Sequence, residues 1–84
     1  MMQIKLKATG VVGDGLPEAA ASLGAEITAA EGATPESVLA AYGIDSTEGF
    51  LVMINEEVVV PSEMTTRRLN DGDHLTILPP LRGG

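Results

Sequence analysis

The chain has 84 residues, no cysteine and a net charge of −7, with five basic residues against twelve acidic ones. This length allows one domain over residues 1–84, and the missing cysteines exclude disulfides, thiolate metal sites and side-chain thiol chemistry. The negative charge disfavours nucleic acid and anionic membranes as partners. Neither a membrane span of ~18 apolar residues nor a signal peptide is expected, so the sequence predicts a cytoplasmic protein.

The first third of the chain predicts two strands separated by a loop. Residues 3–8 alternate polar and apolar side chains with a period of two, as half-buried strands do. The glycines at 10, 13 and 15 then predict a flexible loop, and residues 17–23 could form a short helical turn that stops at Gly24. Residues 25–29 alternate again and fit a second strand.

One main helix, of about eight to ten residues, is predicted after Thr34. Thr34 can cap its first turn, Pro35 loses no needed N–H, and Glu36 suits the positive end of the helix dipole. Gly43 should end the helix. The apolar positions on its buried face are Val38, Leu39 and Tyr42.

The second half of the chain predicts three more strands. Residues 50–54 are apolar throughout, which indicates a strand that is buried on both faces or central in a sheet. A turn at 55–57, with Asn55 suited to a positive φ, should return the chain into a short strand at 58–60. Residues 74–78 form the last predicted strand.

This order of elements indicates an α+β fold of the β-grasp kind, with a mixed sheet of four to five strands packed on one main helix. The first two strands can form a hairpin, and the last strand can return to the centre of the sheet beside the first. Pro79-Pro80 forces an extended exit, so residues 79–84 are expected to be a flexible C-terminal tail.

The body of the chain offers no convincing catalytic or metal site. Residues 10–15 lack the spacing of a dinucleotide or phosphate loop, which leaves a plain flexible loop. Asp71-Gly72-Asp73 lacks the further ligands of a calcium loop and reads as a β-turn. His74 is the single histidine and should point into solvent. We therefore expect a protein that is no enzyme by itself, with no bound metal or cofactor.

The sequence as given ends in Gly83-Gly84, which directs attention to the backbone itself. Two residues without a Cβ could thread a narrow channel and offer the α-carboxylate of Gly84 to another protein's active site. Three of the five cations, Arg67, Arg68 and Arg82, lie in the last eighteen residues of this acidic chain. We hypothesise that they steer the tail toward an acidic or phosphate-bearing site.

Residues 71–84 resemble the ends of small sulfur-carrier proteins, namely the small subunit of molybdopterin synthase and the thiamin sulfur carrier, which are bacterial relatives of ubiquitin. Residues 31–34, before the helix, and 52–55, before the turn, support this resemblance, which extends over 27–84. The Asp-Gly-Asp turn, the strand and the Gly-Gly end are specific to these carriers only in combination.

The resemblance implies that an adenylating enzyme of the ubiquitin-activating type uses ATP to attach AMP to Gly84. A sulfur donor of the cysteine desulfurase or rhodanese type would then leave a thiocarboxylate, which an acceptor synthase subunit would use in cofactor synthesis. Gly83 and Gly84 would be the reacting end, and six extended residues reach about 20 Å into a partner. The expected partner-binding residues are Pro79, Pro80, Leu81, Arg82, Arg67 and Arg68.

Several departures from the carriers keep alternatives open. Leu81-Arg82 before the glycines is similar to the end of ubiquitin, which favours a protein modifier joined through Gly84 as a second hypothesis. Glu56 stands where the carriers often have glycine, and residues 10–24 match no pattern. Pro79-Pro80 and the chain length favour the molybdopterin type over the thiamin type. A β-grasp binding module with an incidental tail is the third hypothesis.

Overall fold

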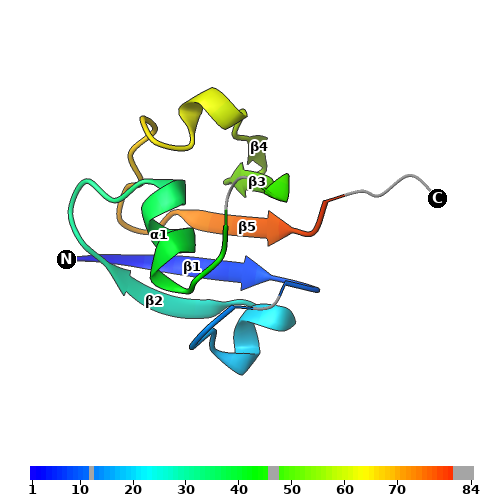
Figure 1. Ribbon diagram of the computed structural model, residues 1–84. Coiled ribbons are helices and arrows are strands. Elements are labelled where there is room, and N and C mark those ends of the chain that lie inside the picture. The colour runs from blue at the N-terminus through cyan, green and yellow to red at the C-terminus, as the bar shows by residue number, and fades with distance from the viewer. Residues whose placement is uncertain (12, 46–47, 81–84) are drawn as a thin grey trace.

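The computed structural model describes residues 1–11, 13–45 and 48–80, which form a sheet with one α-helix across it (Figure 1). The strands are β1 (Met2–Ala8), β2 (Ala25–Ala29), β3 (Leu51–Ile54), β4 (Glu57–Val58) and β5 (His74–Leu78), and the helix is α1 (Pro35–Ala41). The connections contain the 3-10 turns η1 (Glu18–Ala21) and η3 (Pro61–Glu63). The order across the sheet is β2-β1-β5-β3-β4, which confirms the predicted α+β β-grasp fold.

The last strand occupies the centre of the sheet. β5 runs parallel to β1, with Leu6 opposite Leu75, and antiparallel to β3, with Val52 opposite Ile77. β1 and β2 form the expected antiparallel pair. Because β5 is flanked on both sides, the segment that follows it leaves the body from the middle of the sheet.

The core lies between α1 and one face of the sheet. Leu39 of α1 is fully buried there, as are Ile4, Leu6 and Leu75 from the two central strands. Burying such a side chain is worth about 1.5–3 kcal/mol, so these four contribute a large part of the stability of a small domain. The other buried apolar residues are Met2, Ala8, Ala20, Ala25, Ile27, Val38, Ile44, Val52, Ile54, Val59, Met64, Leu69 and Ile77.

Strand β3 is buried on one face only. Val52 and Ile54 are buried, whereas Leu51 is 41% exposed and Met53 is half-buried. Of the two alternatives predicted for this strand, the structure confirms the place inside the sheet, between β5 and β4, and not burial on both faces. The physical reason is that α1 covers one face, and no helix or strand of the described residues covers the other.

Helix α1 begins as predicted. The Thr34 hydroxyl accepts the Ser37 N–H at 3.3 Å, and the Ser37 hydroxyl accepts the Thr34 N–H at 2.9 Å, which forms a capping box. Pro35 occupies the first helical position. These contacts satisfy backbone donors that the first turn of a helix leaves free.

The helix ends in a Schellman motif and has seven residues, fewer than expected. Gly43, at φ 69°, donates its N–H to the Ala40 carbonyl at 3.0 Å, and Ile44 donates to the Leu39 carbonyl at 2.9 Å. Ile44 thereby folds back and is buried, so Tyr42 closes the helix instead of continuing it.

A two-residue turn joins β3 to β4. Asn55 has φ 49° and Glu56 has φ 70°, which confirms the positive φ predicted for Asn55. Turns with two such residues match the twist of a hairpin, and they favour Asn followed by Gly. β4 contains only Glu57 and Val58, fewer residues than predicted, although the Val59 N–H still donates to the Val52 carbonyl at 2.9 Å.

The connection between β1 and β2 packs against the end of α1. A Cβ on Gly13 would lie 2.9 Å from Ile44 Cγ1 and 3.0 Å from the Tyr42 carbonyl oxygen. The Asp14 N–H donates to that same oxygen at 2.6 Å. The described residues of the predicted loop contain no helix or strand, as expected, and at Gly13 the loop approaches α1 so closely that only a residue without a side chain fits. The short helical turn predicted nearby is η1.

Candidate functional site

The base of the predicted tail lies close to two glycines, Gly10 and Gly49. The Pro79 ring lies 3.5 Å from the position of a Cβ on Gly10, and Pro80 lies 3.7 Å from that of a Cβ on Gly49. A Cβ at either glycine would make only ordinary van der Waals contact with the proline, so each proline lies close to a glycine backbone without being crowded by it. They follow β5 at one end of the sheet (Figure 1), and the remaining predicted tail residues, 81–84, lie outside the described residues.

An apolar groove of about 880 Å³ lies beside this exit, and we call it the tail groove. Its walls come from the start of β3, from β4 and the residues after it, and from the end of β5. The lining residues are Glu36, Gly49, Phe50, Leu51, Val58, Val59, Val60, Pro61, Met64, Leu78, Pro79 and Pro80. Glu36 is the one charged residue among them, so the groove offers mainly an apolar surface.

Three large aliphatic side chains in the tail groove are exposed. Leu51 is 41% exposed, Val60 47% and Val58 50%. Single exposed aliphatic residues are common, but several gathered in one hollow mark an interaction surface. Sequence reasoning did not name these residues. The unbroken apolar run of residues 50–54 did indicate an exposed apolar surface. A strand that is covered on one face must expose about half of such a run on the other face.

Of the three predicted cationic residues, Arg67 has a contact that places it away from the base of the tail. Arg67 forms an ion pair of 2.8 Å with Glu57, and Glu57 pairs with Ile54, which lies opposite Leu75 near the start of β5. The tail leaves after Leu78, about 10 Å further along the strand at 3.3 Å per residue. Arg68 is exposed, and Arg82 lies outside the described residues. The steering role of these arginines stays a prediction.

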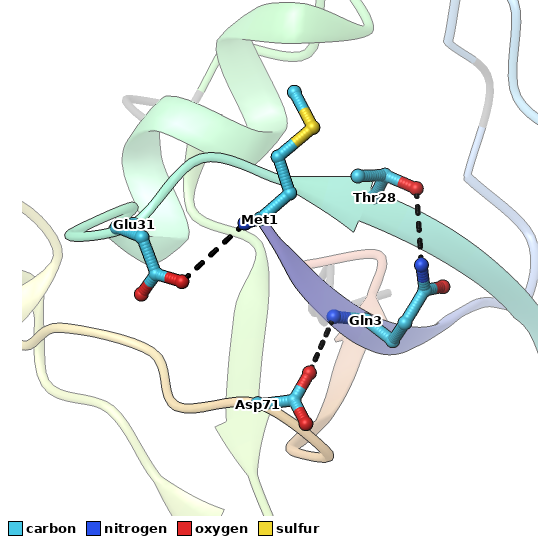
Figure 2. Close-up of polar contacts among 5 residues, drawn as sticks. All are labelled: Met1, Gln3, Thr28, Glu31 and Asp71. Carbon is cyan, nitrogen blue, oxygen red and sulfur yellow. Dashed lines mark hydrogen bonds and ion pairs between the residues drawn. The ribbon is translucent and has the colours of Figure 1, made fainter.

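The turn before β5 fixes the register of that strand. Asp71 Oδ1 accepts the Gln3 N–H at 2.7 Å (Figure 2), and the Gly72 N–H donates to the Gln3 carbonyl at 2.8 Å. Asp73 accepts the Asn70 N–H at 2.8 Å and the Asn55 side-chain amide at 2.9 Å. The β-turn interpretation is confirmed, and both carboxylates serve the fold.

The described residues hold no group of three histidine, aspartate or glutamate side chains that could bind a metal ion. His74 is exposed on β5, as predicted. None of the helices that the structure describes is long and apolar enough to cross a membrane. The feature beside the exit of residues 79–80 is the apolar tail groove.

A mixed sheet with one helix across it, a central last strand and a chain exit beside an apolar groove defines the ubiquitin-like class of β-grasp proteins. The model of the ThiS family matches residues 16–84, and the chain belongs to that family. Its members are small sulfur-carrier proteins that are not enzymes themselves, and they interact with adenylating and synthase partners. A search of curated proteins found no match.

Proposed function

We propose that this chain carries sulfur as a thiocarboxylate on Gly84 and delivers it in cofactor biosynthesis, with the molybdopterin type of pathway favoured over the thiamin type. The observation that carries the proposal is the family match, which extends from residue 16 through the Gly-Gly end. The fold supports it, because β5 and the two prolines after it leave the sheet beside the tail groove.

The chemistry follows from the weakness of a carboxylate as an electrophile. A carboxylate oxygen of Gly84 attacks the α-phosphorus of ATP on an adenylating enzyme, and pyrophosphate leaves. Sulfur from the donor then attacks the acyl carbon, and AMP leaves with the carboxylate oxygen. If the donor is a persulfide, a thiol then cleaves the remaining S–S bond to give the thiocarboxylate. Glycine suits this attack because it places no side chain beside the carbon.

The tail groove is where the adenylating enzyme and the acceptor would hold the body. Leu51, Val58 and Val60 would be covered while the tail reaches the active site. A surface of this kind loses apolar area on binding, which is favourable by about 25 cal/mol per Å² before the costs of association. Both partners would use the same groove, so charging and discharge would take place in turn.

The mass of the intact protein tests this proposal. The chain is purified from its native host and is also incubated with the adenylating enzyme, ATP and a sulfur donor. The expected product has one oxygen replaced by sulfur, and a chain lacking Gly84 gives none. Only unmodified carboxylate under both conditions would refute the proposal. Transfer of labelled sulfur to a pterin precursor, compared with a thiazole precursor, then separates the two cofactor types.

A second candidate is a protein modifier, because Leu81-Arg82-Gly83-Gly84 is similar to the end of ubiquitin. This function predicts isopeptide bonds between Gly84 and lysines of host proteins. Digestion of host lysate with trypsin, followed by mass spectrometry, would reveal Gly-Gly remnants on those lysines. If no such remnants are found and the intact chain carries a thiocarboxylate, the carrier function is supported and the modifier function is refuted.

A further inference from the structure

Strand β2 is an edge of the sheet, and its backbone groups on the outer side face no other strand of the described residues. The Lys5 N–H donates to the Asp73 carbonyl, so the backbone groups of Lys5 point toward β5. Its neighbour Ile4 must then point toward β2, where it lies opposite Ile27. The N–H and C=O groups of Glu26 and Thr28, on either side of Ile27, therefore point outward from the edge.

A groove of about 440 Å³ runs between this edge and α1, and we call it the edge groove. Alanines leave it hollow, since Ala29, Ala30, Ala33 and Ala41 all line it. Ile27, Val38 and Tyr42 add apolar surface, and the other lining residues are Thr28, Glu31, Gly32, Thr34 and Ser37. A strand added to β2 would point every second side chain into this groove, because side chains alternate between the faces of a sheet.

The remaining side chains of an added strand would lie on the outer face of the sheet, where the charges at this edge determine which residues fit. Glu26 is exposed on the outer face of the sheet and lies opposite Lys5 of β1. Glu31, exposed at the end of the edge groove, is 3.5 Å from the terminal ammonium of Met1 (Figure 2). On the β1 side, Glu31 is thus paired with the ammonium of Met1, and Glu26 has Lys5 as its cross-strand neighbour. A strand on the open side of β2 would meet the same carboxylates.

We propose that β2 binds an extended segment of a partner protein in which apolar and basic residues alternate. Its apolar side chains would fill the edge groove, and its basic ones would face Glu26 on the outer face. β1 shows the pattern that fits, since Ile4 lies opposite Ile27 while Lys5 lies opposite Glu26. The site goes beyond the carrier function. Four strand spacings separate β2 from β4, or about 19 Å, so this partner could stay bound while the tail is charged.

A second copy of this chain fits the edge less well. Antiparallel pairing of β2 with its own copy about Ile27 would place Glu26 opposite Thr28 of the copy and bring two Glu26 side chains within diagonal reach. It would also join two bodies that each carry a net charge of −7. The charges therefore favour a basic segment over self-association.

The probe for the test is a synthetic acetylated peptide amide with the sequence of residues 2–8, Met-Gln-Ile-Lys-Leu-Lys-Ala, titrated into the ¹⁵N-labelled chain. We expect amide shifts at Glu26, Thr28, Val38 and Ala41. A peptide with glutamate in place of both lysines should bind more weakly. The proposal would be overturned if the amide shifts were confined to β1 and β5, or if both peptides bound equally well. It would also be overturned if the free chain sedimented as a dimer with protected β2 amides.

Variants of the edge then locate the contact. Thr28→Pro removes an outward N–H that no native strand uses and should weaken the probe at least tenfold. Ala41→Leu, on the exposed side of α1, fills the edge groove without touching the strand and should also weaken it. Glu26→Lys should cost about two- to fivefold, whereas the matched Glu63→Lys should not. Unchanged affinity in the first two variants would sink the proposal.

Deletion of Gly83-Gly84 separates this site from the carrier function. The truncated chain should bind the probe as the full chain does, even though it could no longer be thiocarboxylated. Binding that is lost with the tail would show that the probe occupies the tail rather than β2.

Discussion

Replacing Asp73 with alanine should destabilise the domain by loosening the turn that sets β5 in register. The carboxylate accepts two hydrogen bonds, from the Asn70 N–H at 2.8 Å and from the Asn55 side-chain amide at 2.9 Å. The Asn55 amide oxygen in turn accepts the His74 N–H at 2.9 Å. Loss of the carboxylate therefore also frees the Asn55 side chain, which holds His74, the first residue of β5.

The expected loss of unfolding free energy depends on how exposed the two hydrogen-bond donors are. A net hydrogen bond contributes roughly 1 kcal/mol, and both donors here belong to exposed residues that water can reach once the carboxylate is gone. Asp73→Ala should therefore lower the free energy of unfolding by about 1–2 kcal/mol. For a domain of this size, such a loss corresponds to a Tm lower by roughly 6–12 °C. Asp73→Asn keeps one acceptor oxygen and should lose about half as much.

Urea denaturation followed by circular dichroism measures these losses, with Glu63→Ala as the control for removing one negative charge. Glu63 is exposed, and its side chain makes no hydrogen bond or ion pair among the described residues. Hydrogen exchange of the Asn55 and His74 amides should accelerate in Asp73→Ala. The reasoning is refuted if Asp73→Ala loses no more stability than Glu63→Ala, or if these two amides keep their protection.

Four further predictions concern the turn, the loop, the tail groove and the tail. Glu56→Gly should raise the free energy of unfolding by about 0.5–1 kcal/mol, because glycine adopts φ 70° without strain; an unchanged urea midpoint contradicts this. Gly13→Ala should lower it by about 1–3 kcal/mol through the clash with Ile44, measured in the same way. Val58→Asp should leave the Tm within a few degrees yet slow adenylation in a pyrophosphate-release assay, at least tenfold if the groove contacts the enzyme. Deleting Gly84 should leave the Tm unchanged and abolish thiocarboxylation in the intact mass, and a lower Tm would place the tail in the fold.

The elements of this fold were predictable where a local signal and the final packing agree. Thr34 and Gly43 bound the helix in the sequence as they do in the structure, and residues 25–29 alternate as β2 does. Long-range packing supplied what the sequence did not show. The contact of Gly13 with Ile44 joins residues 31 positions apart in the chain (44 − 13), and no local pattern announces it.

The candidate site was only partly predictable for the same reason. Pro79 and Pro80 were named from the sequence, because prolines after a strand force an extended exit. The tail groove could not be predicted from the sequence, since its walls come from separate segments that meet only in the folded sheet. The apolar run of residues 50–54 left two alternatives open, burial on both faces or a place inside the sheet, because hydrophobicity alone does not tell which face of a strand is covered.

Because β5 lies at the centre of the sheet, the domain cannot fold until this last strand is present. Every fragment that stops before His74 lacks the strand between β1 and β3, so it leaves two unpaired edges and an open core. A nascent chain therefore cannot close this sheet until residues 74–78 have been made. Proteases would remove products that stop before β5, because such products keep an open core.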